Sequence, residues 1–520
     1  MSTRPKTTYT WQPYSTSFSG GSGTVWLLAS ASHCATQASC AGTADETVTT
    51  FAYNGSQNLL PVSKTVRSGD NSAAYTIGWT YDADGNRLSE DGPLAGSGDT
   101  TYWRYDRLRR MTGEIRPDPD GAGVGNPMSA TRFTYDPAGR VVRVEHGSLD
   151  AVPDAAIAPS NWGGFVVHNR IDTSYDIQSR KILETVTGQD QSTASLTQFS
   201  YDGFGRLECT AQRMNPAAFG SLPASACSLG TAGNSGPDRI TRNVYDLAGQ
   251  LVQKRVGVGS TVEAADATYS YTPSGKVAQV VDGNGNRAEL RYDGFDRQSG
   301  WVFPNSAAPG GFNDASPSLA LQTAGTLNEN DYEAYVYDAN GNRTSLRKRD
   351  NSTLSYQYDA LNRLTMKVVP ERPGLSSSHT RDVYYGYDLR GLQTYARFDG
   401  HGGEGISWTY DVFGRRTNET QTMDGTSRTL TSGFNASGVR TSLTHPDGYS
   451  VAYHRDNLNR LFFAEYTGPT SGPLVHTPYN ATGTVDVLYR WRSGTGWYHY
   501  TDYNYDSVQR LAGFTHAFAN

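Results

Sequence analysis

The residues best suited to chemistry in this 520-residue chain are four cysteines in two close pairs, Cys34 with Cys40 and Cys209 with Cys227. Cysteines at such spacing form local disulfides in an exported protein and remain reduced thiols in the cytosol. A zinc site built from His33, Cys34 and Cys40 would lack a fourth nearby ligand and the short cysteine spacing of zinc motifs. The pattern therefore predicts no metal site. It leaves open whether the cysteines form two disulfides or remain reduced.

Three acidic segments imitate the first half of a calcium-binding loop. They are Asp82-x-Asp84-x-Asn86, Asp282-x-Asn284-x-Asn286 and Asp338-x-Asn340-x-Asn342. In an EF-hand, glycine stands at position 6 and glutamate at position 12. Here glycine stands at position 4, and position 12 is Pro93, Asp293 or Arg349. The three segments are therefore interpreted as turns.

Motifs for cofactor binding and catalysis are weak. The segment 400–405 fits a dinucleotide-binding pattern, but a strand-like segment, 406–410, follows where that motif requires a helix. The ten histidines are scattered, without a metalloprotease motif or a nucleophile elbow. We expect no enzyme, no catalytic residue and no cofactor, although a pair of acids assembled from distant segments would leave no local signal.

Composition excludes two classes of partner. Charged residues are 18% of the chain and the net charge is -6, so a basic groove for nucleic acid is not indicated. No run approaches the roughly 18 apolar residues that span a bilayer. The early apolar segment Val25–Ala29 is too short and too far from Met1 for a signal-peptide core. An export signal of this kind is therefore not seen in the chain.

One phrase keeps returning: an aromatic residue, Asp or Asn, two variable residues, Gly or Asn, and then Arg. It occurs seventeen times when a weak copy at Tyr53 and degenerate copies at Phe434, Arg455 and Tyr479 are included. Its first residues are Tyr53, Tyr81, Tyr105, Tyr135, Tyr175, Tyr201, Tyr245, Tyr271, Tyr292, Tyr337, Tyr358, Tyr387, Tyr410, Phe434, Arg455, Tyr479 and Tyr505. The residues taken to shape the clearest turns are Tyr81, Asp82, Gly85 and Arg87; Tyr135, Asp136, Gly139 and Arg140; Tyr201, Asp202, Gly205 and Arg206; and Tyr410, Asp411, Gly414 and Arg415. Close copies are about 21 to 26 residues apart, a period typical of repeat proteins.

Each repeat predicts a β-hairpin. Before the turn, aromatic residues alternate with polar ones, as at Phe133 and Tyr135, which places both rings on one face of a strand. Asp can bond the backbone two residues on, and Gly tolerates positive φ, so Asp-x-x-Gly predicts a tight turn. The aligned rings have two interpretations: packing between hairpins, or a stacking platform for sugars.

Isolated hairpins are marginal in water, so neighbouring repeats must pair into one long antiparallel sheet. Seventeen hairpins give about 34 strands and a strip on the order of 160 Å long, about one turn around a lumen. We expect an all-β, monomeric open spiral made of repeats over 49–520. Residues 1–48, with Trp11 and Trp26, are predicted to cover its first edge, and its C-terminal edge is predicted to remain open to further strands.

The repeated Tyr-Asp-x-x-Gly-Arg phrase, present over about residues 50–515, resembles the YD repeat of RHS proteins. That family includes polymorphic bacterial toxins, shell components of insecticidal toxin complexes, and teneurins. The resemblance implies a sheet that spirals into a hollow shell, in a secreted or surface context that favours the two disulfides. Family toxins end their repeats with a self-cleaving core segment rich in Asp-Pro and Gly-Leu. No such segment is seen here, so neither self-cleavage nor toxicity is expected of this chain.

Three functions follow from the resemblance. The first is a non-enzymatic shell segment of an extracellular or cell-surface RHS protein. The second is a module that binds glycans or a target-cell surface. The third is the shell part of a toxin whose effector lies beyond residue 520. The corresponding partners are glycans, further RHS repeats, a core domain or a toxin cargo.

Overall fold

The computed structural model describes residues 6–18, 21–54, 59–121, 125–307, 309–468, 471–491 and 498–519. It contains 36 strands and one short α-helix in these residues. The first twelve strands are β1 (Thr7–Phe18), β2 (Gly21–Cys34), β3 (Glu46–Tyr53), β4 (Pro61–Ser68), β5 (Ala74–Tyr81), β6 (Arg87–Asp91), β7 (Thr101–Tyr105), β8 (Met111–Ile115), β9 (Met128–Tyr135), β10 (Val141–Leu149), β11 (Val166–Tyr175) and β12 (Lys181–Gly188).

The middle of the chain continues in the same way. Its strands are β13 (Thr193–Tyr201), β14 (Leu207–Arg213), β15 (Arg239–Tyr245), β16 (Leu251–Val256), β17 (Ala264–Tyr271), β18 (Val277–Asp282), β19 (Arg287–Tyr292), β20 (Gln298–Pro304), β21 (Leu327–Tyr337), β22 (Arg343–Arg347), β23 (Thr353–Tyr358) and β24 (Leu364–Val368). The helix α1 (Pro317–Thr323) lies between β20 and β21, and short 3-10 turns occur at Pro159–Asn161, Pro216–Ala218 and Ser377–His379.

The last strands complete the sheet. They are β25 (Val383–Tyr387), β26 (Gln393–Phe398), β27 (Gly405–Tyr410), β28 (Arg416–Met423), β29 (Thr426–Phe434), β30 (Arg440–Thr444), β31 (Ser450–Arg455), β32 (Leu461–Thr467), β33 (Gly472–His476), β34 (Val487–Trp491), β35 (Tyr498–Tyr505) and β36 (Leu511–Ala519). No helix within the described ranges is both long and apolar enough to cross a membrane.

All 36 strands belong to one antiparallel sheet in which each strand pairs with the strands before and after it in the chain. Among the described strands, β1 pairs only with β2, and β36 only with β35. The expected all-β sheet of repeated hairpins is confirmed.

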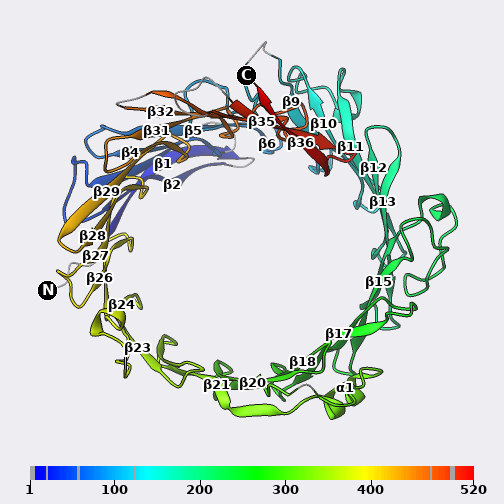
Figure 1. The fold of residues 1–520 in the computed structure, drawn as a ribbon. Helices are drawn as coiled ribbons and strands as arrows, with labels where there is room; N and C mark the ends of the chain where they lie inside the picture. Colours follow the sequence, from blue (N-terminus) through cyan, green and yellow to red (C-terminus); the bar gives the residue numbers. More distant parts are fainter. Residues whose placement is uncertain are drawn as a thin grey trace.

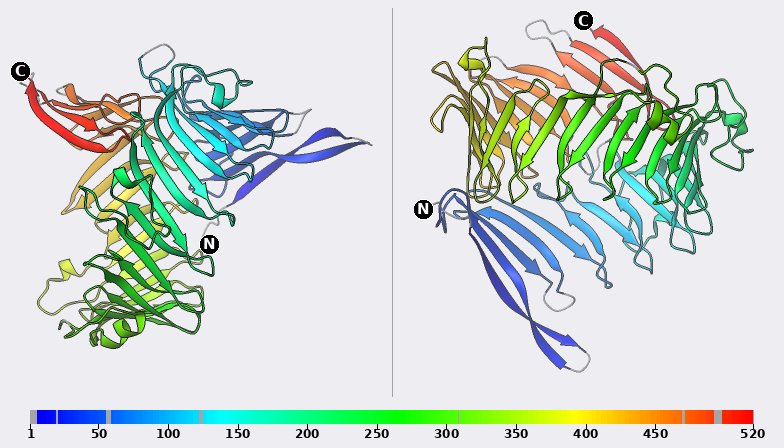
Figure 2. Two further views of the ribbon diagram at one scale, coloured as in Figure 1. Left: turned by 90° about the vertical axis from the view of Figure 1, so that its right-hand side faces the viewer. Right: turned by 90° about the horizontal axis from the view of Figure 1, so that it is seen from below.

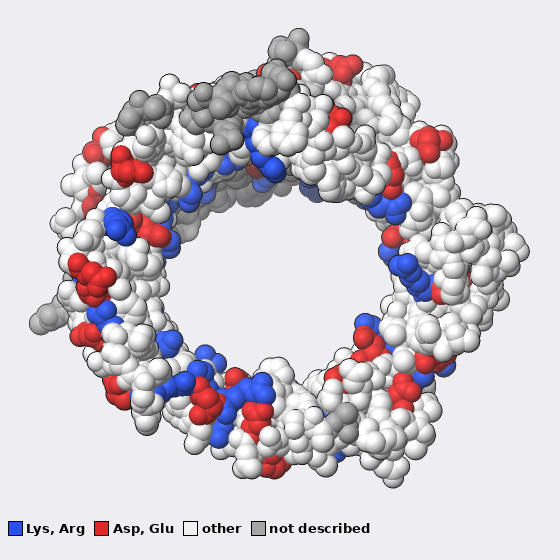
Figure 3. All heavy atoms as spheres, in the orientation of Figure 1, with Lys and Arg blue, Asp and Glu red and all other residues white. Residues whose placement is uncertain are grey.

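The sheet winds into a ring around an open lumen (Figure 1). The space-filling view shows that side chains do not close this lumen (Figure 3). A side view shows the strands following one another around the ring as a spiral strip (Figure 2). The architecture is therefore the open β-shell that the repeats predicted.

The strip has two edges, which we name by their turns. The YD edge carries the turns of the repeated phrase, such as Asp136–Arg140, and the connecting edge carries the turns and loops between repeats. The YD edge of late repeats meets the connecting edge of early ones along a line that we call the seam. There the Thr47 hydroxyl donates to the Val412 carbonyl, 365 residues away, at 2.7 Å. The Asn457 side chain donates to the Asp118 carbonyl, 339 residues away, at 2.9 Å.

These separations mean that one turn of the spiral takes roughly 340 to 365 residues. The 520-residue chain therefore completes one turn and overlaps itself, whereas the sequence estimate gave about one turn. The difference arises because the number of strands fixes the length of a strip but not the width of its lumen. Spiral overlap thus brings together segments that are distant in the sequence.

The N-terminal hairpin has a different course from the rest of the sheet. Only Ser30–Cys34 of β2 pairs with β3, and the remainder of the β1–β2 hairpin projects from the ring (Figure 2). Trp11 and Trp26 lie on this projecting part, each more than half exposed. Residue 48 falls inside β3. The division of the chain there, and its covering role, stay predictions.

Two small cores form where long loops fold back on the sheet. The first contains Ile115, Met128, Ala130, Leu149 and Trp162. The second contains Cys209, Ala211, Ala226, Ile240 and Val258. Both cores include residues of inserted loops between strands, so the loops 150–165 and 214–238 are packed parts of the shell wall.

Candidate functional site

The YD turn is built by an Asp and an Arg four residues later. In the fourth copy, which begins at Tyr135, Asp136 Oδ1 accepts a hydrogen bond from the backbone N–H of Arg140 at 2.9 Å. Asp136 Oδ2 accepts from the Arg140 guanidinium at 2.7 Å. Gly139 has φ +81°, which a residue with a side chain adopts only under strain. Sixteen turns of the repeated phrase close with a backbone bond from their first residue to the residue four positions on.

Where a turn has this arginine and another repeat follows, the arginine also reaches the next repeat. The Arg140 guanidinium lies over the Tyr175 ring, 4.8 Å from its centre, and donates to the Asp176 carbonyl at 3.0 Å. Seven further repeats place the arginine over the following aromatic ring: Arg110–Tyr135, Arg180–Tyr201, Arg206–Tyr245, Arg297–Tyr337, Arg363–Tyr387, Arg415–Phe434 and Arg460–Tyr479. One side chain thus links two successive hairpins.

The tyrosine hydroxyls make the second link. Tyr175 donates to the Val141 carbonyl, the residue after Arg140, at 2.9 Å. Fourteen of the fifteen tyrosines that begin a repeat make an equivalent bond to the preceding hairpin, at 2.6 to 3.0 Å. We call this series of Asp–Arg pairs, ring contacts and hydroxyl bonds the tyrosine–arginine ladder.

The ladder faces the lumen. The loop before α1 runs outside the ring (Figure 1), and its Asp314 carbonyl accepts from Gln253. Gln253 pairs with Thr268, so Thr268 points outward. Side chains alternate along a strand, and Tyr269 and Tyr271 therefore point inward. Figure 3 shows Lys and Arg side chains at many places along the inner rim.

Hydrogen bonding and ion pairing lower the pKa values of the ladder aspartates. The backbone N–H of Arg140 and then its guanidinium hold the pKa of Asp136 below the ordinary aspartate value. The pKa is lowered in the same direction at Asp106, Asp176, Asp202, Asp293, Asp359 and Asp506. These carboxylates remain charged and hydrogen-bonded, an arrangement suited to holding a frame and unsuited to proton transfer near neutral pH.

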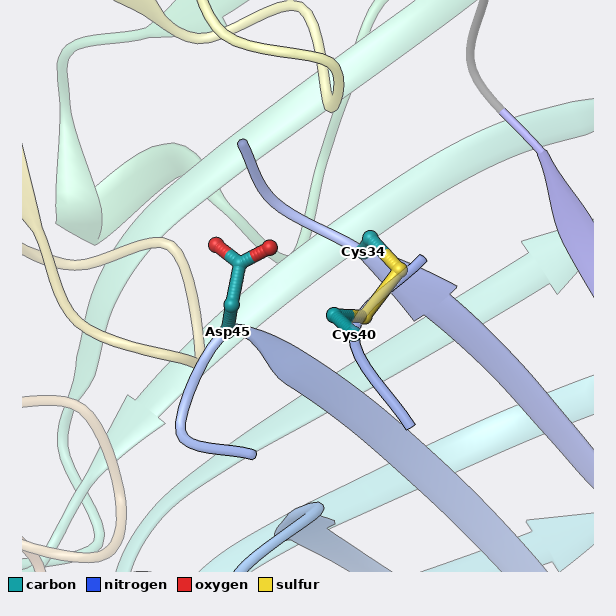
Figure 4. A group of neighbouring side chains, drawn as sticks. All are labelled: Cys34, Cys40 and Asp45. Atoms are coloured by element: carbon teal, nitrogen blue, oxygen red, sulfur yellow. A yellow bond between two sulfur atoms is a disulfide. The ribbon is translucent and has the colours of Figure 1, made fainter. Parts of the chain in front are cut away.

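Both cysteine pairs are disulfides in the structure. Cys34 is bonded to Cys40, and Cys209 to Cys227 within the second core. The carboxylate of Asp45 lies near the first disulfide (Figure 4). Sulfurs bonded to each other are not thiolate ligands, and Asp45 accepts hydrogen bonds from the backbone of Thr36 and Gln37. Cys34, Cys40 and Asp45 therefore hold an ordered loop in place.

Arg87 departs from its expected place. Asn86 occupies the position of the ladder arginine and donates to Asp82 at 2.7 Å. Arg87 instead donates to Glu90 at 2.7 Å, and its guanidinium lies over the Trp79 ring. The turn has the same length as the one at Asp136–Arg140, so Asn86 replaces the ladder arginine and Arg87 is the first residue of the next strand, β6.

The other motifs of the sequence lie in turns and connections between strands. Asp82, Asp282 and Asp338 each accept from an asparagine side chain four residues on, in turns. The glycine-rich segment 400–405 joins β26 to β27. The predicted turn residues lie along the wall and do not converge on one centre.

Sequence reasoning missed the arginine and hydroxyl contacts between repeats. It explained Asp136 by the turn alone and aromatic rings by packing or sugar stacking. The available signal was the Arg that stands four residues after the turn Asp in nine of the repeats, because a turn by itself does not require a guanidinium there.

A single antiparallel meander wound around an open lumen and tied by a repeated ladder defines a YD-repeat β-shell. Residues 337–371 match the sequence model of the RHS repeat. A search of curated proteins found no match. Together with the repeated phrase, the match over residues 337–371 identifies RHS/YD repeats in the chain, and the shell fold agrees with them.

One solved structure agrees with this fold. The chain is similar to one from the Photorhabdus luminescens Tc holotoxin pore, with a TM-score of 0.53 at 11% identity, over 98% of this chain and 26% of that chain. The crystal structure of TcdB2-TccC3 gives a TM-score of 0.38 at 14% identity, over 97% of this chain and 29% of that chain. The chain thus spans about a quarter of the length of these proteins, and the first likeness shows the fold alone.

The hydroxyl link predicts a local loss of stability. Tyr175→Phe keeps the ring beneath Arg140 but removes the bond to the Val141 carbonyl, a loss of about 1 kcal/mol. Hydrogen exchange of amides in β10 to β12 should become roughly fivefold faster. Tyr9→Phe, on the projecting hairpin, should leave exchange in these strands unchanged. Equal protection of β10 to β12 in wild type and Tyr175→Phe would contradict a stabilising role of the bond.

The ladder carboxylates predict a stability that falls in acid. Their pKa is lower in the folded than in the unfolded chain, so their contribution is complete above about pH 4 and is lost as pH falls through the folded value. Asp136→Asn should unfold at a lower temperature than wild type at pH 7, and the two should converge near pH 3. Thermal unfolding followed by circular dichroism measures both. A pH-independent difference would rule out the ion pair as its cause.

Proposed function

We propose that this chain is a non-enzymatic, structural section of a secreted RHS shell whose lumen encloses part of a cargo polypeptide. The observation that carries the proposal is the open lumen inside a spiral sheet, with a wall tied from repeat to repeat by the ladder. A continuous sheet around a solvent space separates an enclosed chain from its surroundings.

The chemistry of the wall supports a structural role. The ladder carboxylates are paired with arginine, as Asp136 is with Arg140 and Asp202 with Arg206. Ion-paired carboxylates of this kind fix the geometry of the turns. A general acid or base would instead need a pKa nearer to neutral pH. The proposal therefore assigns these residues to the frame.

The disulfides support an extracellular or cell-surface location. Two bridges in one chain are typical of proteins that mature in oxidising compartments. The proposed partners are further RHS repeats, a core domain, or an effector that follows residue 520 in a longer toxin.

Protease protection tests the shell. The native protein should be recovered outside the cell without free thiols, together with a polypeptide that resists added protease until the shell is unfolded. Phe413→Asp should open the seam, because this ring packs 5.1 Å from that of Tyr75, and should make the polypeptide at least tenfold more sensitive. Val336→Asp, at an exposed strand position, is the control. Recovery only from the cytosol with reduced cysteines, or equal cleavage with and without the folded shell, would refute the proposal.

Binding to glycans is a second candidate, favoured by an aromatic row across β31 to β35. His454, Phe463, His476, Tyr489 and Tyr500 are opposite one another on successive strands and share one face. His476 also lines a pocket of about 370 Å³ at the seam. Planar rings beside polar groups fit the apolar face and hydroxyls of a sugar.

A glycan array measures this candidate directly. If the row binds a saccharide, Tyr489→Ala should weaken binding of the captured glycan at least tenfold. Tyr9→Ala, on the projecting hairpin, should leave binding unchanged. An array without any bound glycan, or equal binding by Tyr489→Ala, would exclude the row as a sugar platform.

A further inference from the structure

Six turns on the YD edge expose a large apolar side chain at the tip, one or two residues after the first turn residue. These side chains, which we call the tip row, are Leu108, Ile177, Phe204, Leu247, Phe295 and Leu361. Their exposed fractions range from 55% to 101%. Single exposed apolar residues are common, but a row at one structural position along one edge is typical of an interaction surface.

In later repeats, the same turn position is covered by another part of the chain. Phe413, at the same position in its turn, packs against Tyr75, and the Val412 carbonyl accepts from Thr47. The Asn457 N–H donates to the Pro119 carbonyl at 3.0 Å. These tips rest on the connecting edge of the early repeats and are no longer largely exposed. The seam is therefore an interface between YD tips and a connecting edge.

Both surfaces of that interface, the YD tips and the connecting edge, also occur uncovered elsewhere in the molecule. The tip row lies on the YD edge before the overlap, between residues 106 and 363, where the described residues of the chain place no connecting edge against it. On the connecting edge beyond the overlap, Val262 and Leu375 are exposed in the loops before β17 and β25. The molecule thus has one bare row of tips and one bare stretch of the edge that receives tips.

We propose that the tip row is a docking surface for the connecting edge of a second copy of this chain. A second copy is the occupant because its uncovered connecting edge, with Val262 and Leu375 exposed, continues the edge that receives tips in the seam. The contact continues an interface that the single chain has begun. It is head to tail, since two different surfaces meet, and can add further copies.

This inference goes beyond the proposed function, because a single chain forms the lumen with or without a second copy. It differs from the monomer expected from the sequence. That expectation considered only the two end strands of the sheet, β1 and β36, as places where another chain could pair. The tip row lies instead on the turns of the YD edge.

Sedimentation velocity over a concentration series tests the association. Wild type should shift from the monomer mass of 56.5 kDa toward dimers and larger species as concentration rises. Ile177→Ser/Phe204→Ser/Leu247→Ser should require at least tenfold higher concentration for the same shift. These side chains are almost fully exposed, so the fold should survive, which circular dichroism checks. Val336→Ser, an exposed apolar residue inside a strand, should associate as wild type does.

Mixing two variants tests the head-to-tail arrangement. Val262→Asp/Leu375→Asp alters the connecting edge and should also weaken self-association at least tenfold. Mixed with the tip-row triple variant, it should form a dimer and nothing larger, because each variant retains the half that the other has lost. A wild type that stays monomeric at all concentrations, a triple variant that associates normally, or a mixture without dimers would each overturn the proposal. None of these outcomes affects protease protection of cargo, so the two proposals fail separately.

Discussion

The structure depends on the contact of one guanidinium with two hairpins. In each complete repeat, the arginine is fixed by its own aspartate, and this leaves the flat face of the guanidinium and one N–H free for the next repeat, as Arg140 shows with Tyr175 and Asp176. A pair of strands alone would let successive hairpins slide or twist relative to each other. The arginine sets their offset, and constant offsets produce a regular spiral.

Much of this architecture could be predicted because it is local. The alternation before Tyr135 and the Asp-x-x-Gly turn specify a hairpin, and repetition specifies a sheet. The Arg140–Tyr175 contact was missed because it joins two repeats, and its distance in sequence changes with the inserted loops. The place of Arg87 was missed because Asn86 takes the ladder position and an arginine happens to follow it at the start of β6.

The seam and the lumen could not be predicted from the residues. Thr47 and Val412 meet only because the strip returns after a full turn, and that return depends on a small twist added at each of many strands. The projecting β1–β2 hairpin is a similar case. Its aromatic residues suggested a cap, but Trp11 and Trp26 lie beyond the short stretch of β2 that pairs with β3.

The purely sequential pairing of the strands has a consequence for how such a chain folds. Every strand finds its partner among its immediate neighbours, so the sheet can grow in order as the chain leaves the ribosome, with little entropy lost in closing long loops. Among the described residues, only the seam joins positions more than three hundred residues apart. Because the seam alone needs so long a loop to close, we expect it to form after the strands of the sheet have paired.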